Sequence, residues 1–268
     1  ITGLIPTREH SPHVPLTPQE IVADALRVVD AGAQIVHLHT RDAEGRDSCD
    51  AAGYGEILTA IRRERPETIC VVSLSGRAGH DLERRLEVLT LTGDAKPDLG
   101  SLTLGSVSFP TGTSVNAPDT IARLAEEMAA RDIRPELECF DVGMVAYARH
   151  LERRGLLRGP HYFNLLLGSL GSTPATLTNL AAMVDALPEA STWAAAGVGR
   201  FQLPMNVAGL VAGGGARVGL EDNLHYDLQR ERLATNVELV ARVARIAAEL
   251  GRELATPAEA RAMLGLAP

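Results

Sequence analysis

Two histidines one residue apart are the first candidates for chemistry in this chain. His37 and His39 lie in the run Ile35–Arg41, where strand alternation would place both imidazoles and Arg41 on one face. At a rise of ~3.3 Å per residue the two histidines would be ~6.6 Å apart along the strand. That spacing lets them converge on one metal ion, although such a pair can also be purely structural.

A carboxylate pair near the end of the chain offers the missing ligand. The run that starts at Ala216 ends in Glu221 and Asp222, and Arg217 would share a face with Glu221. If the strands close into a barrel, this run lies one strand away from the histidines, so Glu221 can be the third ligand. Two histidines and one carboxylate suit zinc best, with other divalent transition metals possible. Asp222 would lie at the strand end, where it could act as a base. The alternative is that Glu221 and Asp222 are an exposed carboxylate pair in a turn.

Other expected strand ends are also polar. Ser73 and Thr103 are close to glycines, and hydroxyls in that setting suit a carboxylate or phosphate, or equally an ordinary turn. Glu136 and Glu138 would point the same way from one run, which is costly unless a cation such as Arg217 matches them.

The elements that must position these residues alternate from one end of the chain to the other. Eight runs predict strands: Ile1–Ile5, Ile35–Arg41, Thr68–Leu74, Leu99–Gly105, Pro135–Asp141, His161–Gly168, Thr192–Val198 and Ala216–Asp222. Amphipathic stretches predict the helices: Thr17–Ala31, Ala52–Arg63, Asp81–Leu91, Asp119–Ala130, Val142–Arg154, Pro174–Ala186, Pro204–Ala212 and Arg232–Leu250.

Eight strand–helix units without a polar linker predict one (β/α)₈ TIM barrel domain over residues 1–268. A doubly wound sheet is the second possibility, but no GxGxxG motif follows the first run. The segment from Thr256 to Leu266 predicts an extra C-terminal helix that packs on the barrel or on a neighbouring subunit.

Composition removes several classes of function. The 268 residues carry 26 Lys and Arg against 34 Asp and Glu, a net charge of −8, which disfavours nucleic-acid binding. Lys96, the one lysine, lies in a polar segment, so Schiff-base chemistry is not expected. Three cysteines without CxxC spacing and no long apolar run favour a cytoplasmic protein with no membrane segment.

Seven motifs occur in a fixed order along the chain. They are Ile1-Thr2-Gly3, Thr7-Arg8-Glu9-His10-Ser11-Pro12, His37-Leu38-His39-Thr40-Arg41-Asp42, Ser73-Leu74-Ser75-Gly76-Arg77, Leu102-Thr103-Leu104-Gly105-Ser106, Pro135-Glu136-Leu137-Glu138 and Arg217-Val218-Gly219-Leu220-Glu221-Asp222-Asn223. Together, from Ile1 to about Asn223, this set resembles the β-keto acid cleavage enzyme family.

The resemblance implies a zinc-dependent (β/α)₈ enzyme, usually a homotetramer, that converts a β-keto acid and acetyl-CoA into acetoacetate and a new acyl-CoA. The positions that match the family's motifs fall into four groups: zinc ligands His37, His39 and Glu221; hydroxyls near the substrate carboxylate, Ser73 and Thr103; proton-transfer residues Arg217 and Asp222; and Glu138, with Glu136 as a substitute, supporting the arginine.

The resemblance also bears on the substrate. Members that act on an amino substrate carry a glutamate where this chain has Ile5, so we expect Ile5 to favour a neutral or apolar 3-oxo acid. Arg8 and His10 leave open an anionic tail if either side chain turns inward.

Two other classes of function remain as alternatives. An HxH pair on a barrel strand also begins the pattern of zinc-dependent amidohydrolases, but His80, His150, His161 and His225 fall in or beside helices or at a strand's start. The third possibility is a binding protein that holds its metal for structure only.

Overall fold

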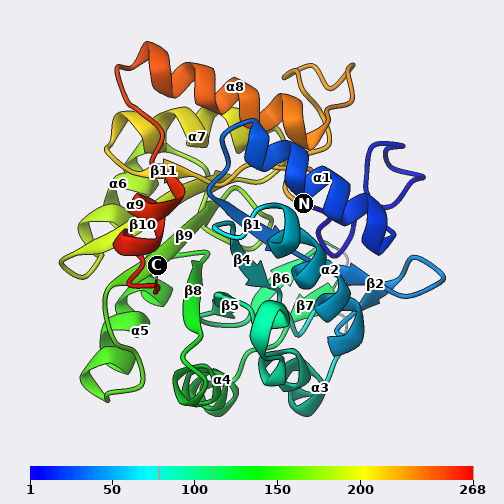
Figure 1. Cartoon of the computed structure of the whole chain (residues 1–268). Coiled ribbons are helices and arrows are strands. Elements are labelled where there is room, and N and C mark those ends of the chain that lie inside the picture. The colour runs from blue at the N-terminus through cyan, green and yellow to red at the C-terminus, as the bar shows by residue number, and fades with distance from the viewer. Residues whose placement is uncertain (78, 111, 268) are drawn as a thin grey trace.

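A curled sheet of seven parallel strands forms the centre of the computed structural model, which describes residues 1–77, 79–110 and 112–267 (Figure 1). Each of these seven strands pairs with the next of the seven in chain order, and the main helices lie outside the sheet. In spatial order the strands are β1 (Ile35–Leu38), β4 (Ile69–Val72), β5 (Leu99–Thr103), β8 (Arg134–Cys139), β9 (His161–Leu167), β10 (Ser191–Gly197) and β11 (Gly215–Ala216).

Helices and two small hairpins connect these strands. The α-helices are α1 (Pro18–Asp30), α2 (Ala51–Glu64), α3 (Leu82–Glu87), α4 (Pro118–Ala130), α5 (Val142–Arg153), α6 (Leu177–Asp185), α7 (Gln202–Val211), α8 (Asn236–Glu249) and α9 (Pro257–Met263). Short 3₁₀ turns are η1 (Val88–Thr90), η2 (Gly93–Ala95) and η3 (Gly199–Phe201). The antiparallel hairpins are β2 (Thr40–Arg41) with β3 (Asp47–Ser48), and β6 (Val107–Phe109) with β7 (Gly112–Ser114).

Side-chain caps fix where the helices begin. Thr17 caps α1, and Glu20 completes the capping box, as the sequence predicts. Helix α8 begins at Asn236 and not at Arg232, because Thr235 and Glu238 form a second capping box at that point.

The prediction of a first strand at Ile1–Ile5 is wrong. Gly3 has φ +72°, which takes the backbone out of the extended region, and a Cβ there would lie 2.7–2.9 Å from atoms of Glu221. The segment still reaches the edge of the sheet, because the Ile1 amine donates a 2.9 Å hydrogen bond to the His37 carbonyl.

The eighth expected strand is much shorter than predicted. Only Gly215–Ala216 pairs with β10, and the chain then turns through residues 217–222. Within the ranges that the structure describes, no strand ladder joins β1 to β11. The fold is therefore TIM-barrel-like, with a seven-stranded sheet in place of the predicted ring of eight.

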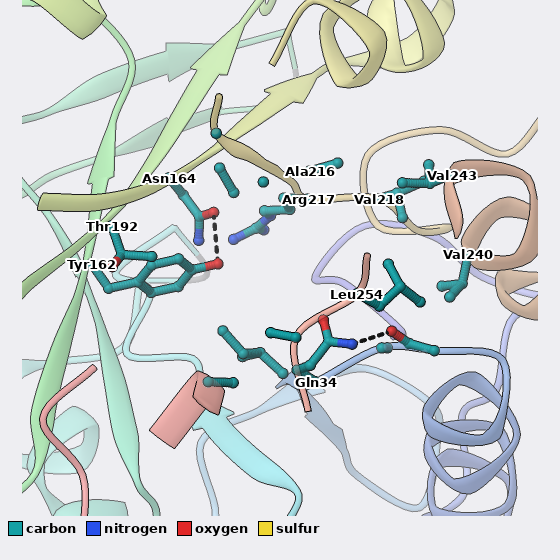
Figure 2. A pocket seen from close by; sticks show the side chains of 18 of the residues that line it. Gln34, Tyr162, Asn164, Thr192, Ala216, Arg217, Val218, Val240, Val243 and Leu254 are labelled. Carbon is teal, nitrogen blue, oxygen red and sulfur yellow. Dashed lines mark hydrogen bonds between the residues drawn. The ribbon is translucent and has the colours of Figure 1, made fainter. Parts of the chain in front are cut away.

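A cavity of about 850 Å³ lies along this opening (Figure 2). Its lining includes Val36 and Ala216 from the two edge strands and Val240 and Val243 from α8. Helix α9 covers the starts of β4 and β5, where Leu264 belongs to one buried cluster with neighbouring strand residues. The expected C-terminal helix therefore packs on the barrel.

The helices are short. Among the residues that the structure describes, none combines the length and the apolar character needed to cross a membrane.

Candidate functional site

A cavity of about 510 Å³ opens where the strands end, and nine of the residues singled out from the sequence line it, while Glu136, the substitute for Glu138, does not. The nine are Ile5, His37, His39, Ser73, Thr103, Glu138, Arg217, Glu221 and Asp222. The carboxyl ends of parallel strands meet at one face, which is where barrel enzymes carry their active sites. The structure thus brings these side chains together, while their roles stay predictions.

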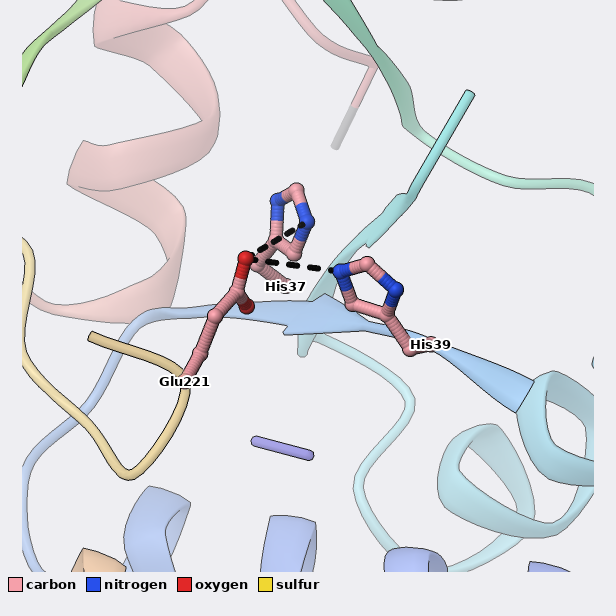
Figure 3. Close-up of side chains that lie close together, drawn as sticks. All are labelled: His37, His39 and Glu221. Atoms are coloured by element: carbon pink, nitrogen blue, oxygen red, sulfur yellow. Dashed lines mark ion pairs between the residues drawn. The ribbon is translucent and has the colours of Figure 1, made fainter. Parts of the chain in front are cut away.

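His37, His39 and Glu221 converge on one point of this cavity (Figure 3). Glu221 Oε1 lies 3.4 Å from His39 Nε2 and 3.9 Å from His37 Nε2. One ligand atom from each residue lies within 4.8 Å of the other two, so the three could hold a single ion. Alternation from His37 to His39 and the neighbouring position of the 217–222 turn produce this arrangement.

The other ring nitrogen of each histidine faces a carboxylate. His37 Nδ1 lies 2.6 Å from Glu136 Oε2, and His39 Nδ1 lies 3.6 Å from Asp47 Oδ1. Both Nε2 atoms are therefore directed into the cavity. Carboxylates behind histidines are the usual companions of metal-ligating imidazoles.

Arg217 is the centre of the acidic residues in the cavity. Its Nη2 lies 2.8 Å from Glu221, its Nη1 3.0 Å from Glu138, and its Nε 3.3 Å from Asp222. Glu136 is more distant from this guanidinium, at 3.7 Å. Glu138 is thus the glutamate nearer to the arginine, and Glu136 lies closer to His37.

Burial and charge shift the pKa values of the two carboxylates in opposite directions. Burial opposes ionisation of Glu221, but Arg217 and the two histidines outweigh it and hold its pKa well below the usual range. Burial raises the pKa of Asp222 above its ordinary value; Arg217 works against this shift and Glu221 reinforces it. Asp222 is therefore the more basic carboxylate of the pair.

The charges of the cluster suit an added cation. One guanidinium faces the four carboxylates of Glu136, Glu138, Glu221 and Asp222, so these five groups alone, when all are ionised, sum to 1 − 4 = −3. Burial would lower the pKa of His39, yet Glu221 and Asp47 raise it to about 9. Among the described residues, His39 Nε2 is buried without a hydrogen-bond partner. A divalent ion would satisfy that nitrogen and offset most of the negative charge.

The two hydroxyls differ in their partners. Thr103 donates a 2.8 Å hydrogen bond to Glu138 Oε2, so its proton is already engaged. Ser73 Oγ accepts a 3.4 Å hydrogen bond from the Ser75 amide and can still donate its proton into the cavity. The geometry therefore favours Ser73 over Thr103 as a donor to a substrate carboxylate.

The chain neighbours of Ile5 in the cavity lining, Leu4 and Pro6, carry no charge. Arg8 forms an ion pair with Glu20, and His10 Nδ1 lies 2.9 Å from the Thr7 hydroxyl; neither residue lines the cavity.

Two residues near the triad were given no role from the sequence. The β2–β3 hairpin carries Asp47 to His39, and the Asp42–Gly45 turn that forms it is a recognisable hairpin pattern. Arg77 lines the cavity and its guanidinium lies 3.9 Å from the centre of the Phe109 ring. The four histidines considered for a hydrolase, and Lys96, do not line it.

A curled parallel sheet with a histidine–carboxylate triad and an acid–base cluster at its carboxyl ends defines a TIM-barrel-like enzyme. The sequence matches the family described as beta-keto acid cleavage enzyme over residues 1–266. The chain belongs to this family of acetyl-CoA-dependent enzymes.

Curated relatives match nearly the whole chain. It is 39% identical to a 3-keto-5-aminohexanoate cleavage enzyme of Fusobacterium nucleatum subsp. nucleatum, covering 99% of this chain and 96% of that protein. It is 40% identical to a 3-oxoadipate:acetyl-CoA acetyltransferase of Cupriavidus necator, covering 99% and 93%. The substrates named for these relatives differ in charge.

Solved structures of ObcA share the fold. The apo structure of ObcA superposes with a TM-score of 0.86 at 26% identity, covering 96% of this chain and 66% of ObcA. A ternary complex of ObcA with a C4-CoA adduct and oxalate gives a TM-score of 0.83 at 25% identity, covering 96% and 68%.

Proposed function

We propose that the chain is a zinc-dependent enzyme that condenses a β-keto acid with acetyl-CoA and releases acetoacetate and a new acyl-CoA. The observation that carries the proposal is the shared cavity of the His37–His39–Glu221 triad and the Arg217–Asp222 pair. Family membership favours this function over the hydrolase and over a non-catalytic metal protein.

When bound, zinc would supply a Lewis acid for the keto oxygen and carboxylate of the substrate and lower the barrier to removing the proton between them. Ser73 would donate a hydrogen bond to that carboxylate. Asp222 would take the proton, because its raised pKa makes it the better base of the two carboxylates. Arg217 and Glu138 would hold Asp222 in position.

The carbon–carbon chemistry then follows in the substrates. The carbanion attacks the thioester carbonyl of acetyl-CoA and displaces the CoA thiolate. This thiolate attacks the original keto carbonyl, and the retro-Claisen step breaks the carbon–carbon bond to give the new acyl-CoA and the carbanion of acetoacetate. Asp222 would return its proton to that carbon, which yields acetoacetate and restores the base.

Metal removal tests the proposal directly. We expect one zinc per chain by metal analysis, and we expect loss of acetoacetate formation after chelation with recovery when zinc is added back, because three protein ligands leave exchangeable positions. Activity should require both a β-keto acid and acetyl-CoA. Full turnover in a metal-free sample, or turnover without CoA, would refute the proposed chemistry.

For the substrate we propose a neutral or apolar 3-oxo acid. Ile5 and its chain neighbours Leu4 and Pro6 offer no carboxylate to an ammonium group, so a substrate cation that lost water on binding there would be uncompensated. Arg8 and His10 are held outside the cavity. Arg77 supports a second candidate, a keto diacid, because it brings a cation to the cavity wall.

The substrate expectation is tested with three acids that differ only in the tail. We expect kcat/KM to be highest for 3-oxohexanoate, lower for 3-oxoadipate and lowest for 3-keto-5-aminohexanoate. Arg77→Ala should leave the value for 3-oxohexanoate within a few-fold. A preference for the diacid that Arg77→Ala abolishes would establish the second candidate, and a preference for the amino acid would refute both.

A further inference from the structure

A network of polar side chains runs from His37 away from the 510 Å³ cavity of the candidate site and toward the 850 Å³ cavity. Glu136 Oε2 lies 2.6 Å from His37 Nδ1, and Glu136 Oε1 accepts a 2.7 Å hydrogen bond from Asn164 Nδ2. Glu136 is 1% exposed and Asn164 is fully buried. A carboxylate this deeply buried is costly unless both its oxygens have partners, and here both do.

Tyr162 settles the orientation of the Asn164 amide. Its hydroxyl donates a 3.4 Å hydrogen bond to Asn164 Oδ1 (Figure 2). The amide nitrogen is therefore turned toward Glu136. The pairing of β8 with β9 sets Glu136 opposite Tyr162 and Glu138 opposite Asn164. The pairing of these two strands therefore positions Glu136, Asn164 and Tyr162 relative to one another.

We propose that Glu136, held by Asn164, is the positioning residue for His37. Its carboxylate keeps the ring proton on Nδ1 and directs the Nε2 lone pair toward His39 and Glu221, because the partner of one ring nitrogen decides which nitrogen carries the proton. This inference rests on the proposed function, since it takes His37 as a zinc ligand. The family resemblance gives Glu136 only as a substitute for Glu138.

His39 is held less tightly. Its Nδ1 lies 3.6 Å from Asp47 Oδ1, beyond hydrogen-bond length, and Asp47 also contacts His80 at 3.0 Å. The larger positioning effect should therefore be at His37.

Glu138 provides the matched control. It lies two residues along the same strand and on the same face, carries the same charge, and contacts Arg217 and Thr103 in place of His37. Glu138→Gln therefore removes one negative charge from the cluster without touching the imidazole. Asn164→Leu does the converse, because it removes the restraint on Glu136 without changing any charge.

Zinc titration of the metal-free proteins against a chromophoric chelator separates positioning from charge. We expect the Kd for zinc to rise about 10–100-fold in Glu136→Gln, in the range found for partners of metal-bound histidines. The rise should be clearly smaller in Glu138→Gln, and Asn164→Leu should also weaken binding. Equal rises in Glu136→Gln and Glu138→Gln would show that only charge matters and would overturn the inference.

A second measurement needs no metal. In the metal-free protein, ¹⁵N shifts of the His37 ring should show the proton on Nδ1 in the wild type and in Glu138→Gln, and a mixture of tautomers in Glu136→Gln. The same mixture in Glu138→Gln would contradict the inference. A wild type that binds no zinc but shows this pattern would refute the proposed function while leaving the positioning of His37 established.

Discussion

Replacing Asp222 by Asn is expected to lower kcat by about 10²–10⁴-fold, the usual contribution of a general base. The amide keeps the shape of the side chain but cannot accept the proton. Zinc content should stay at the wild-type value, because the three ligand atoms that converge belong to His37, His39 and Glu221. Steady-state kinetics and metal analysis on the same preparation give both results.

The backbone at Asp222 should keep its place in this variant. Its amide donates to the Gly219 carbonyl at 3.3 Å, and its carbonyl accepts a 2.7 Å hydrogen bond from the Gly199 amide. The raised pKa also means that folding disfavours the ionised carboxylate, so removing it should not lower the free energy of unfolding at neutral pH. A loss of activity would therefore not be a loss of structure.

Asp119→Asn is a suitable control, since Asp119 is exposed at the start of α4 and does not line the cavity. Its kcat should equal that of the wild type. If Asp222→Asn loses zinc together with activity, Asp222 is a ligand or a structural residue, and its role as the base would have to be abandoned.

The convergence of His37, His39 and Glu221 could be predicted from the sequence because simple periodicities place these residues. Alternation along β1 and into the residue that follows it puts His37 and His39 on one face, and the order of the strands brings the Glu221 segment, which is a turn and not the predicted strand, beside them. Arg217 and Asp222 follow from the same turn. These residues depend on backbone geometry that is nearly the same wherever parallel strands end.

Residues that depend on side-chain packing or on irregular backbone were harder to predict. Asp47 reaches His39 only because a hairpin leaves the sheet after β1, and the role of Glu136 is visible only once Asn164 is known to lie beside it. The Ile1–Ile5 run has strand-like composition, yet Gly3 at φ +72° breaks it. Such contacts are set by tertiary structure that no local pattern encodes.

Replacing Arg217 by Met is expected to lower the free energy of unfolding of the metal-free protein by about 3–5 kcal/mol, as for other buried ion pairs that lose one partner. The side chain is only 10% exposed, and its three nitrogens contact three different carboxylates. Without it the four acidic side chains, including Glu136, would have no guanidinium to offset them, and the charge would change from −3 to 0 − 4 = −4. Urea unfolding at neutral pH measures the loss.

Lysine at the same position separates charge from geometry. Arg217→Lys keeps the cation but cannot reach Glu138, Glu221 and Asp222 from three directions, so we expect a smaller loss of stability than in Arg217→Met and still a large loss of kcat. Arg158→Met, at an exposed position, should change the unfolding free energy by less than about 0.5 kcal/mol.

The pH dependence of the unfolding free energy shows whether Arg217 stabilises the protein through its charge. Burial opposes the ionisation of Glu221, but Arg217 and the histidines hold its folded pKa well below the usual range of a glutamate. A carboxylate with a lowered pKa contributes stability above its unfolded pKa and loses it as the pH falls toward the folded value. The difference between wild type and Arg217→Met should therefore be largest near neutral pH and shrink below about pH 4.5, because the crowded carboxylates of the variant take up protons. A difference that is constant across this range would mean that Arg217 stabilises the protein by packing and not by its charge.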